Sequence, residues 1–146
     1  MPDYPTNIPP ELSVTCEAIA YQGEGVQIYQ CTPEGRWAFQ SPRASLRDDN
    51  GNLAAEHFAG PTWQAADGST VVGRKIAEST PDPDAVPWLL LEAASNTGNG
   101  IFSTVRFIQR LATAGGTAPT ESCHGSALIE VPYTALYVFY ALRRNT

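Results

Sequence analysis

The sequence predicts an all-β fold, a single-domain antiparallel β-barrel or β-sandwich of about nine short strands. Runs rich in Val, Ile, Tyr and Phe are separated by turn signals at roughly 8–12-residue spacing. No stretch of eleven residues repeats its apolar positions with the 3.6-residue period of a helix. A length of 146 residues suits one domain.

The first half of the chain is predicted to be an arm followed by short strands. Residues 1–11 hold four prolines and indicate an extended N-terminal arm, so the β-domain comprises residues 12–146. Gly23-Glu24-Gly25 and the Pro-Glu-Gly run that ends at Gly35 are expected to turn the chain. The strands expected here are 12–20, 26–31, 36–39, 44–47 and 53–58.

The second half repeats this pattern of strands and turns. Asn50-Gly51 and Asp67-Gly68 are strong turn signals because Asn and Gly tolerate positive φ. Residues 80–87 are expected to form a loop, since their prolines interrupt any ladder. The strands expected here are 70–77, 86–93, 101–111 and 133–142.

The charge and the apolar runs exclude some partners. The formal net charge of −6 repels the phosphate backbone, so we expect no nucleic-acid partner. No apolar run approaches the ~20 residues that a membrane-spanning helix needs, so no membrane span is expected. The oligomeric state is not indicated.

The start of the chain bears on its location. After Met1 there is no basic segment followed by an apolar one, as a signal peptide would have, and the start is rich in proline. This favours a mature form that carries an added Met. We therefore expect a secreted or periplasmic protein, although the same start is compatible with a cytoplasmic one.

Six short strings of the sequence have a familiar order and spacing: Gly25–Cys31, His57–Trp63, Asp67–Gly73, Pro87–Leu91, Ile108–Leu111 and Val131–Ala135. Together they resemble a large uncharacterised family of secreted bacterial and fungal proteins, a domain of unknown function, over residues 12–142. The resemblance implies a secreted β-rich domain and carries no catalytic assignment. Some fungal members bear the label malate dehydrogenase, which the lone G-x-G at Gly23–Gly25 does not support.

Three cysteines leave the disulfide question open. They allow one disulfide and one free thiol, or three reduced cysteines. The resemblance implies a bridge between Cys31 and Cys123, because these two lie inside the family pattern and Cys16 does not. This chain departs from the pattern beside the bridge, with Ser122 where the family has Gly and His124 where an acidic residue usually follows.

The richest candidate cluster is His57, Trp63 and Asp67. A histidine with a near-neutral pKa suits acid–base catalysis, Asp67 could orient it, and Trp63 could stack on a ring or sugar. We take His57 and Asp67 as candidate catalytic residues. The alternative is structural: Asp67 belongs to a turn, Trp63 to the core, and His57 is a satisfied strand residue.

A second set of residues suits ligand binding. Arg106 and Arg110 are four apart and are expected on one strand face, where a guanidinium binds a carboxylate bidentately. The alternative interpretation of the two arginines is that they lie on an exposed sheet face or pair with acidic residues. The alternative interpretation of the aromatic residues is that they pack in the core. The candidate ligand-binding residues are Gln27, Tyr29, Trp63, Lys75, Arg106, Arg110 and Tyr133, with Trp88, Tyr137 and Tyr140 as further aromatic candidates.

Metal and nucleophile chemistry find little support. His57 and His124 alone are too few ligands, so no metal and no cofactor is predicted.

Three hypotheses of function remain. The first is a secreted module that binds a small organic molecule or glycan. The second is a lyase, isomerase or hydrolase that uses His57 for acid–base chemistry. The third is a cell-surface structural or self-associating protein.

Overall fold

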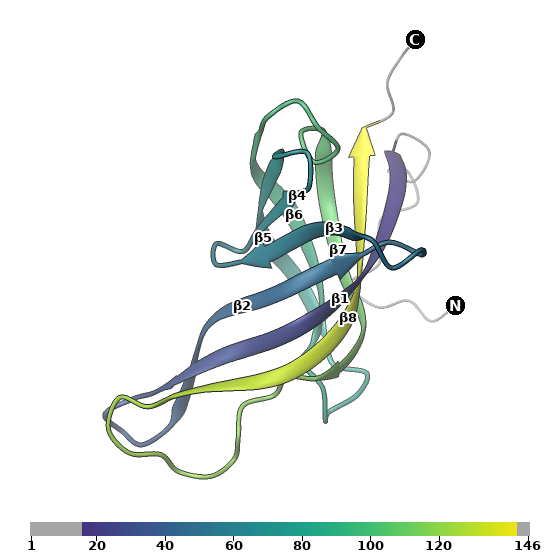
Figure 1. The fold of residues 1–146 in the computed structure, drawn as a ribbon. Coiled ribbons are helices and arrows are strands. Elements are labelled where there is room, and N and C mark those ends of the chain that lie inside the picture. Colours follow the sequence, from purple (N-terminus) through teal and green to yellow (C-terminus); the bar gives the residue numbers. More distant parts are fainter. Residues whose placement is uncertain (1–15, 143–146) are drawn as a thin grey trace.

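A computed structural model describes residues 16–142, and the predicted arm at residues 1–11 lies outside them. Eight antiparallel strands close into a barrel in chain order, which confirms the all-β prediction (Figure 1). None of the described residues forms a helix that is long and apolar enough to cross a membrane. The strands are β1 (Cys16–Cys31), β2 (Trp37–Arg47), β3 (Leu53–Phe58), β4 (Thr62–Ala65), β5 (Thr70–Ser79), β6 (Trp88–Thr97), β7 (Val105–Gly115) and β8 (Leu128–Leu142).

Three strands, β1, β2 and β8, extend beyond the barrel (Figure 1). β1 pairs with β8 from Cys16 to Gln30 and with β2 from Gln22 to Cys31. Their far ends leave the barrel together as a three-stranded ribbon (Figure 1). β3 pairs with β2 only from Ala44 onward, so within residues 16–142 the first part of β2 pairs with β1 alone.

The expected turn at Gly23-Glu24-Gly25 is wrong, because β1 runs straight through these residues. Both glycines serve close approach. A Cβ on Gly25 would lie 2.1 Å from the Arg43 carbonyl oxygen, and a Cβ on Gly23 would lie 2.7 Å from the Tyr137 ring. Glycine is required in this strand because a neighbouring backbone or ring occupies the space of a side chain.

Other strand boundaries also differ from the prediction. The expected strands at 36–39 and 44–47 form one strand, β2, which contains Pro42 on its unpaired edge. β4, of four residues, was not predicted. Residues 101–104 form a turn before β7, where Asn96 Nδ2 donates to the carbonyl oxygens of Phe102 and Val105 at 2.8 and 3.0 Å.

The barrel interior is filled by large side chains from β4, from β8 and from the turn before β7. Trp63, Phe102, Tyr137 and Phe139 are almost completely buried, and the Phe102 and Phe139 rings lie 4.6 Å apart. Buried and exposed residues alternate along β3, as expected for a strand with one face on the core.

A disulfide joins Cys31 to Cys123, which confirms the pairing that the family resemblance implied. It ties the end of β1 to the long loop before β8. The Cys123 amide also donates to the Gly35 carbonyl oxygen at 3.0 Å, so the β1–β2 turn and this loop are joined twice.

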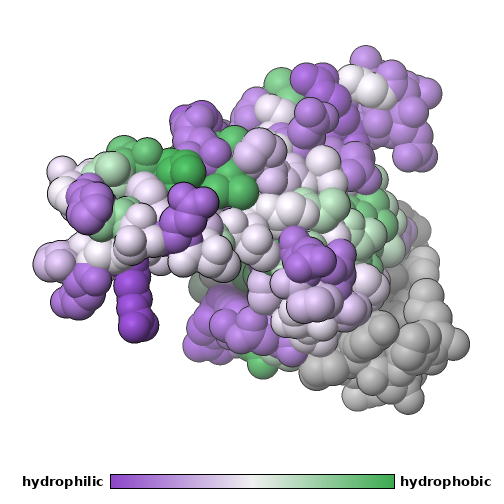
Figure 2. Space-filling view, turned by 90° about the horizontal axis from the view of Figure 1, so that it is seen from below, coloured by the Kyte–Doolittle hydropathy of each residue, from purple (hydrophilic) through white to green (hydrophobic). Residues whose placement is uncertain are grey.

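The surface at the ribbon end is mixed. Seen from below, apolar areas are separated by hydrophilic ones (Figure 2). The large exposed apolar residues are spread over four strands and a turn, as Phe39, Leu53, Phe58, Ile76, Ile101 and Leu128.

Candidate functional site

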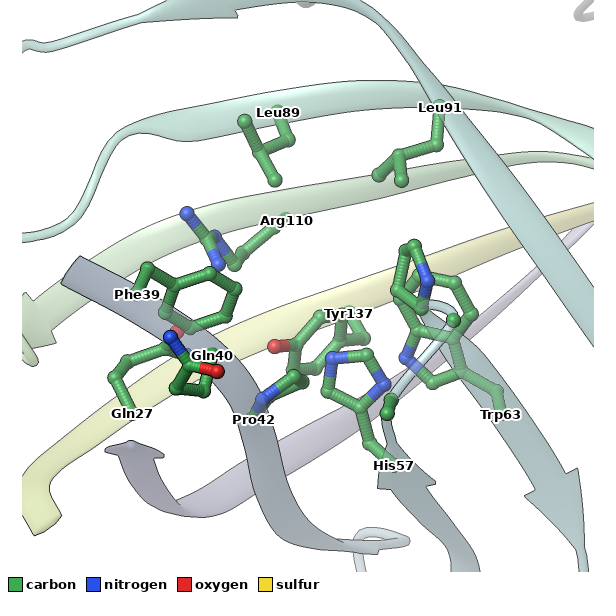
Figure 3. A pocket seen from close by; sticks show the side chains of 13 residues that line it. Gln27, Phe39, Gln40, Pro42, His57, Trp63, Leu89, Leu91, Arg110 and Tyr137 are labelled. Carbon is green, nitrogen blue, oxygen red and sulfur yellow. The ribbon is translucent and has the colours of Figure 1, made fainter. Parts of the chain in front are cut away.

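A cavity of about 260 Å³ lies in the barrel beside the unpaired part of β2. Side chains from every strand except β5 line it, together with the β3–β4 turn. Leu89 and Leu91 point into it from β6, and Phe39 lies beside Gln40 on β2 (Figure 3). The polar residues of the lining are Gln27, Gln40, His57, Arg110 and Tyr137.

His57 lies on β3 with its ring fixed from two sides. Its Nδ1 is 2.9 Å from the Thr62 carbonyl oxygen, so Nδ1 carries the proton and donates. The ring stacks on Trp63 with centroids 4.3 Å apart and planes 10° apart. Because Nδ1 is protonated in the neutral ring, Nε2 is left as a hydrogen-bond acceptor.

The protonation state of His57 follows from its burial. Its pKa is lowered from 6.5 to about 3, chiefly by burial; the hydrogen bond to Thr62 opposes this shift, and the Arg110 charge adds to it. Desolvation disfavours the charged imidazolium. His57 is therefore a neutral residue at physiological pH and a weak base.

The structure does not pair His57 with Asp67. The Asp67 Oδ1 atom accepts from Ser69 Oγ at 2.6 Å and from the Ser69 amide at 2.9 Å, while Oδ2 accepts from the Ile101 amide at 2.9 Å. These hydrogen bonds lower the Asp67 pKa, the Ser69 hydroxyl most. Asp67 thus joins two turns. The Thr62 carbonyl oxygen, and not Asp67, orients the His57 ring.

Arg110 enters the cavity from β7, between Leu89 on β6 and Tyr137 on β8. Its Nε and Nη2 atoms both donate to the Pro87 carbonyl oxygen, at 3.0 and 2.9 Å. Thr113, on the same strand, donates to the Val86 carbonyl oxygen at 2.6 Å. The loop before β6 therefore holds the guanidinium in place while its remaining N–H groups stay available.

Two tyrosine hydroxyls lie next to Arg110. Tyr133 and Tyr137 are 2.7 Å apart at their hydroxyl oxygens, and the Arg110 guanidinium is within hydrogen-bonding reach of Tyr137. Burial raises the pKa of both hydroxyls, so both stay protonated at physiological pH. The Tyr137 ring reaches this position across Gly23, which leaves room for it.

Two buried donors of the lining have no hydrogen-bond partner among the described residues. They are the Gln27 Nε2 and Trp63 Nε1 atoms. Gln27 lies close to the Tyr133 hydroxyl, but its Nε2 atom has no partner there with hydrogen-bond geometry. Gln27 exposes 2% of its surface and Trp63 exposes 1%. A buried donor without an acceptor costs about 1–3 kcal/mol, so each one marks a position where a ligand or water oxygen would be favourable.

The predicted ligand-binding residues divide into three groups. Gln27, Trp63 and Arg110 line the cavity. Tyr133 lies behind it, and Tyr29 donates to the Gly116 carbonyl oxygen at 2.5 Å. The third group, Lys75 and Arg106, lies apart from the cavity.

Lys75 and Arg106 are exposed for identifiable reasons. Lys75 pairs with Glu78 at 3.0 Å. Arg106 lies at a β-bulge between Val105 and Phe107, which changes the alternation of the strand, so the expected common face of Arg106 and Arg110 is wrong. Arg106 donates to Asn96 Oδ1 at 3.4 Å instead.

Sequence reasoning missed the apolar half of the lining. Leu89 and Leu91 were predicted only as buried strand, and Phe39, Gln40 and Pro42 were assigned no role. Pro42 carried a usable signal, because a proline inside a β-run indicates an unpaired edge. No group of three or more His, Cys, Asp or Glu residues among residues 16–142 is placed to hold a metal ion.

Comparison with known protein families gives one match, to a protein of unknown function (DUF3455), over residues 13–141. The chain belongs to this family. Neither the curated proteins nor the solved structures give a match. All the residues that line the cavity fall inside the matched segment, so the cavity is part of the family domain.

Proposed function

We propose that this protein binds a small organic molecule in the cavity beside β2. The observation that carries the proposal is the set of unused polar groups in the lining. Among the described residues, Gln27 and Trp63 each present a buried donor without a hydrogen-bond partner, and Arg110 has more N–H groups than its contacts with Pro87 and Tyr137 use. A ligand with oxygen acceptors would satisfy them.

The cavity volume limits the size of the ligand. A volume of about 260 Å³ exceeds the ~150 Å³ of an engineered cavity that binds benzene. It falls below the ~300–1,000 Å³ of pockets for drug-sized ligands. A molecule built on one substituted ring therefore fits, and a single sugar ring is of the same scale.

Binding is supported over acid–base catalysis by the state of His57. A general base works best when its pKa lies near the working pH. Burial holds the His57 pKa at about 3, and Nδ1 is committed to the Thr62 carbonyl oxygen. The ring is better suited to accept a hydrogen bond from a ligand through Nε2.

The proposed location outside the cytoplasm has support from the Cys31–Cys123 disulfide. Disulfides persist in oxidising compartments and are rare in the cytosol. A binding domain in such a compartment would meet small molecules from the surroundings of the cell.

The proposal is tested by a thermal-shift screen of sugars, small organic acids and aromatic compounds. Saturation at 100 times Kd stabilises a protein by about 2.7 kcal/mol, which is about 5–10 °C for this size. Leu89→Trp fills the cavity, and Leu53→Trp makes the same change at an exposed position.

We expect the screen to find compounds that raise the Tm of the wild type and of Leu53→Trp. The same compounds should leave the Tm of Leu89→Trp unchanged. Calorimetry should then give a stoichiometry of one. A broad panel without any stabilising compound, or compounds that act equally on Leu89→Trp, would contradict the proposal.

A further inference from the structure

Arg110 is a buried cation without a counter-charge among the described residues. It exposes 9% of its surface. The ion pairs of residues 16–142 are Arg43–Glu130, Arg74–Glu92 and Lys75–Glu78, all at exposed or half-exposed positions. The acceptors near Arg110, the Pro87 carbonyl oxygen and the Tyr137 hydroxyl, carry no net charge.

The groups around Arg110 do not neutralise it either. Its charge reaches Tyr29, His57, Tyr133 and Tyr137, and none of these is a carboxylate. Burial raises the pKa of the three tyrosines and lowers that of His57, so all four are neutral at physiological pH. A buried charge that no opposite charge balances is costly to the folded state.

We propose that the cavity takes the ligand as an organic carboxylate, with the carboxylate on Arg110 and a ring against the apolar residues of the lining. This inference rests on the proposed binding function. A guanidinium presents parallel N–H groups that match the two oxygens of a carboxylate. Gln27 Nε2, which lies in the same lining, is a further donor.

The rest of the lining decides between a carboxylate and other anions. Arg110 is the only Lys or Arg in the described lining, so one negative charge is balanced and a doubly charged phosphate is not. Leu89 and Leu91 on β6 and Trp63 on β4 supply apolar surface in the same lining, which suits a compact apolar body (Figure 3). One charge and one apolar ring describe a monocarboxylic acid.

The experiment compares benzoate with benzamide, which has the same ring and nearly the same shape but no charge. Isothermal titration calorimetry is run on the wild type, on Arg110→Gln and on Arg106→Gln. Arg106 is the matched control because it lies on the same strand and is exposed. The comparison within the wild type needs no variant, so it stands even where Arg110→Gln folds poorly.

We expect the wild type and Arg106→Gln to bind benzoate at least tenfold more tightly than benzamide. Arg110→Gln should lose that preference. Equal or tighter binding of benzamide by the wild type would overturn the carboxylate inference and leave the proposed function standing. The carboxylate inference would also be overturned, and the proposed function would stand, if neither probe binds while other compounds of the panel bind to the wild type and not to Leu89→Trp. If no compound of the panel binds, both proposals fall.

Discussion

Acidification from pH 7 to pH 4.5 should destabilise the fold by about 2.5 kcal/mol through His57 alone. The unfolded chain protonates this histidine near its ordinary pKa of 6.5, whereas burial keeps the folded value at about 3. Since the unfolded state binds the proton first, stability is fully present above pH 6.5 and falls as the pH decreases toward 3.

The magnitude follows from the distance between the two pKa values. Each pH unit below 6.5 and above the folded pKa costs about 1.4 kcal/mol. At pH 4.5, two units below the unfolded value, the cost is about 2.7 kcal/mol, of which about 0.2 is already present at pH 7. The result barely changes if the folded pKa is one unit higher, because pH 4.5 remains above it.

The assay is urea unfolding at both pH values for three proteins. His57→Asn keeps a side-chain N–H that can reach the Thr62 carbonyl oxygen and removes the titration. His124→Asn removes the other histidine of the chain, which is exposed. The wild type and His124→Asn should lose about 2.5 kcal/mol more than His57→Asn on acidification.

Two results would refute this reasoning. One is an equal loss of stability in His57→Asn and the wild type. The other is an NMR titration of the wild type in which the His57 ring protonates near pH 6.5, since such a ring would be neither desolvated nor restricted to its neutral form.

Three further perturbations test other parts of the structure. Replacement of Cys31 and Cys123 by Ser opens a long loop and should cost up to about 4–5 kcal/mol in urea unfolding, and an unchanged midpoint would contradict this. Gly23→Ala should destabilise the fold by about 1–3 kcal/mol, because the new Cβ would lie 2.7 Å from the Tyr137 ring. The same substitution should weaken ligand binding, and an unchanged free energy of unfolding would argue against this close packing. Asp67→Ala should speed hydrogen exchange of the Ile101 amide by removing its acceptor, and unchanged exchange would show that the contact does not protect it.

The all-β class was predictable because local chemistry specifies it. The turns at Asn50-Gly51 and Asp67-Gly68 lie where positive φ is needed, and Gly51 and Gly68 have φ of 81° and 92°. The loop at 80–87 follows from prolines that cannot extend a ladder. These features depend on few neighbours in sequence, so a single chain is enough to find them.

Features that depend on a neighbouring strand were not predictable in the same way. Gly23 and Gly25 resemble turn residues in isolation, and only the ring of Tyr137 and the backbone at Arg43 show why glycine is needed within a strand. The bulge at Arg106 likewise shifts one residue of β7 against β8, which separates the faces of Arg106 and Arg110.

The opening of the cavity follows from the way in which β2 is paired. In the ribbon, β2 pairs with β1, and β1 pairs with β8. β3 pairs with β2 only from Ala44 onward, so the barrel wall is interrupted beside Pro42. A strand edge exposes N–H groups that invite further pairing, and proline presents none. Pro42 lies in the part of β2 that pairs with β1 alone, in the cavity lining with Arg110 and His57, and it has no N–H to offer another strand. The rule that confines proline to strand edges indicates this opening from the sequence, once 36–47 is recognised as one strand.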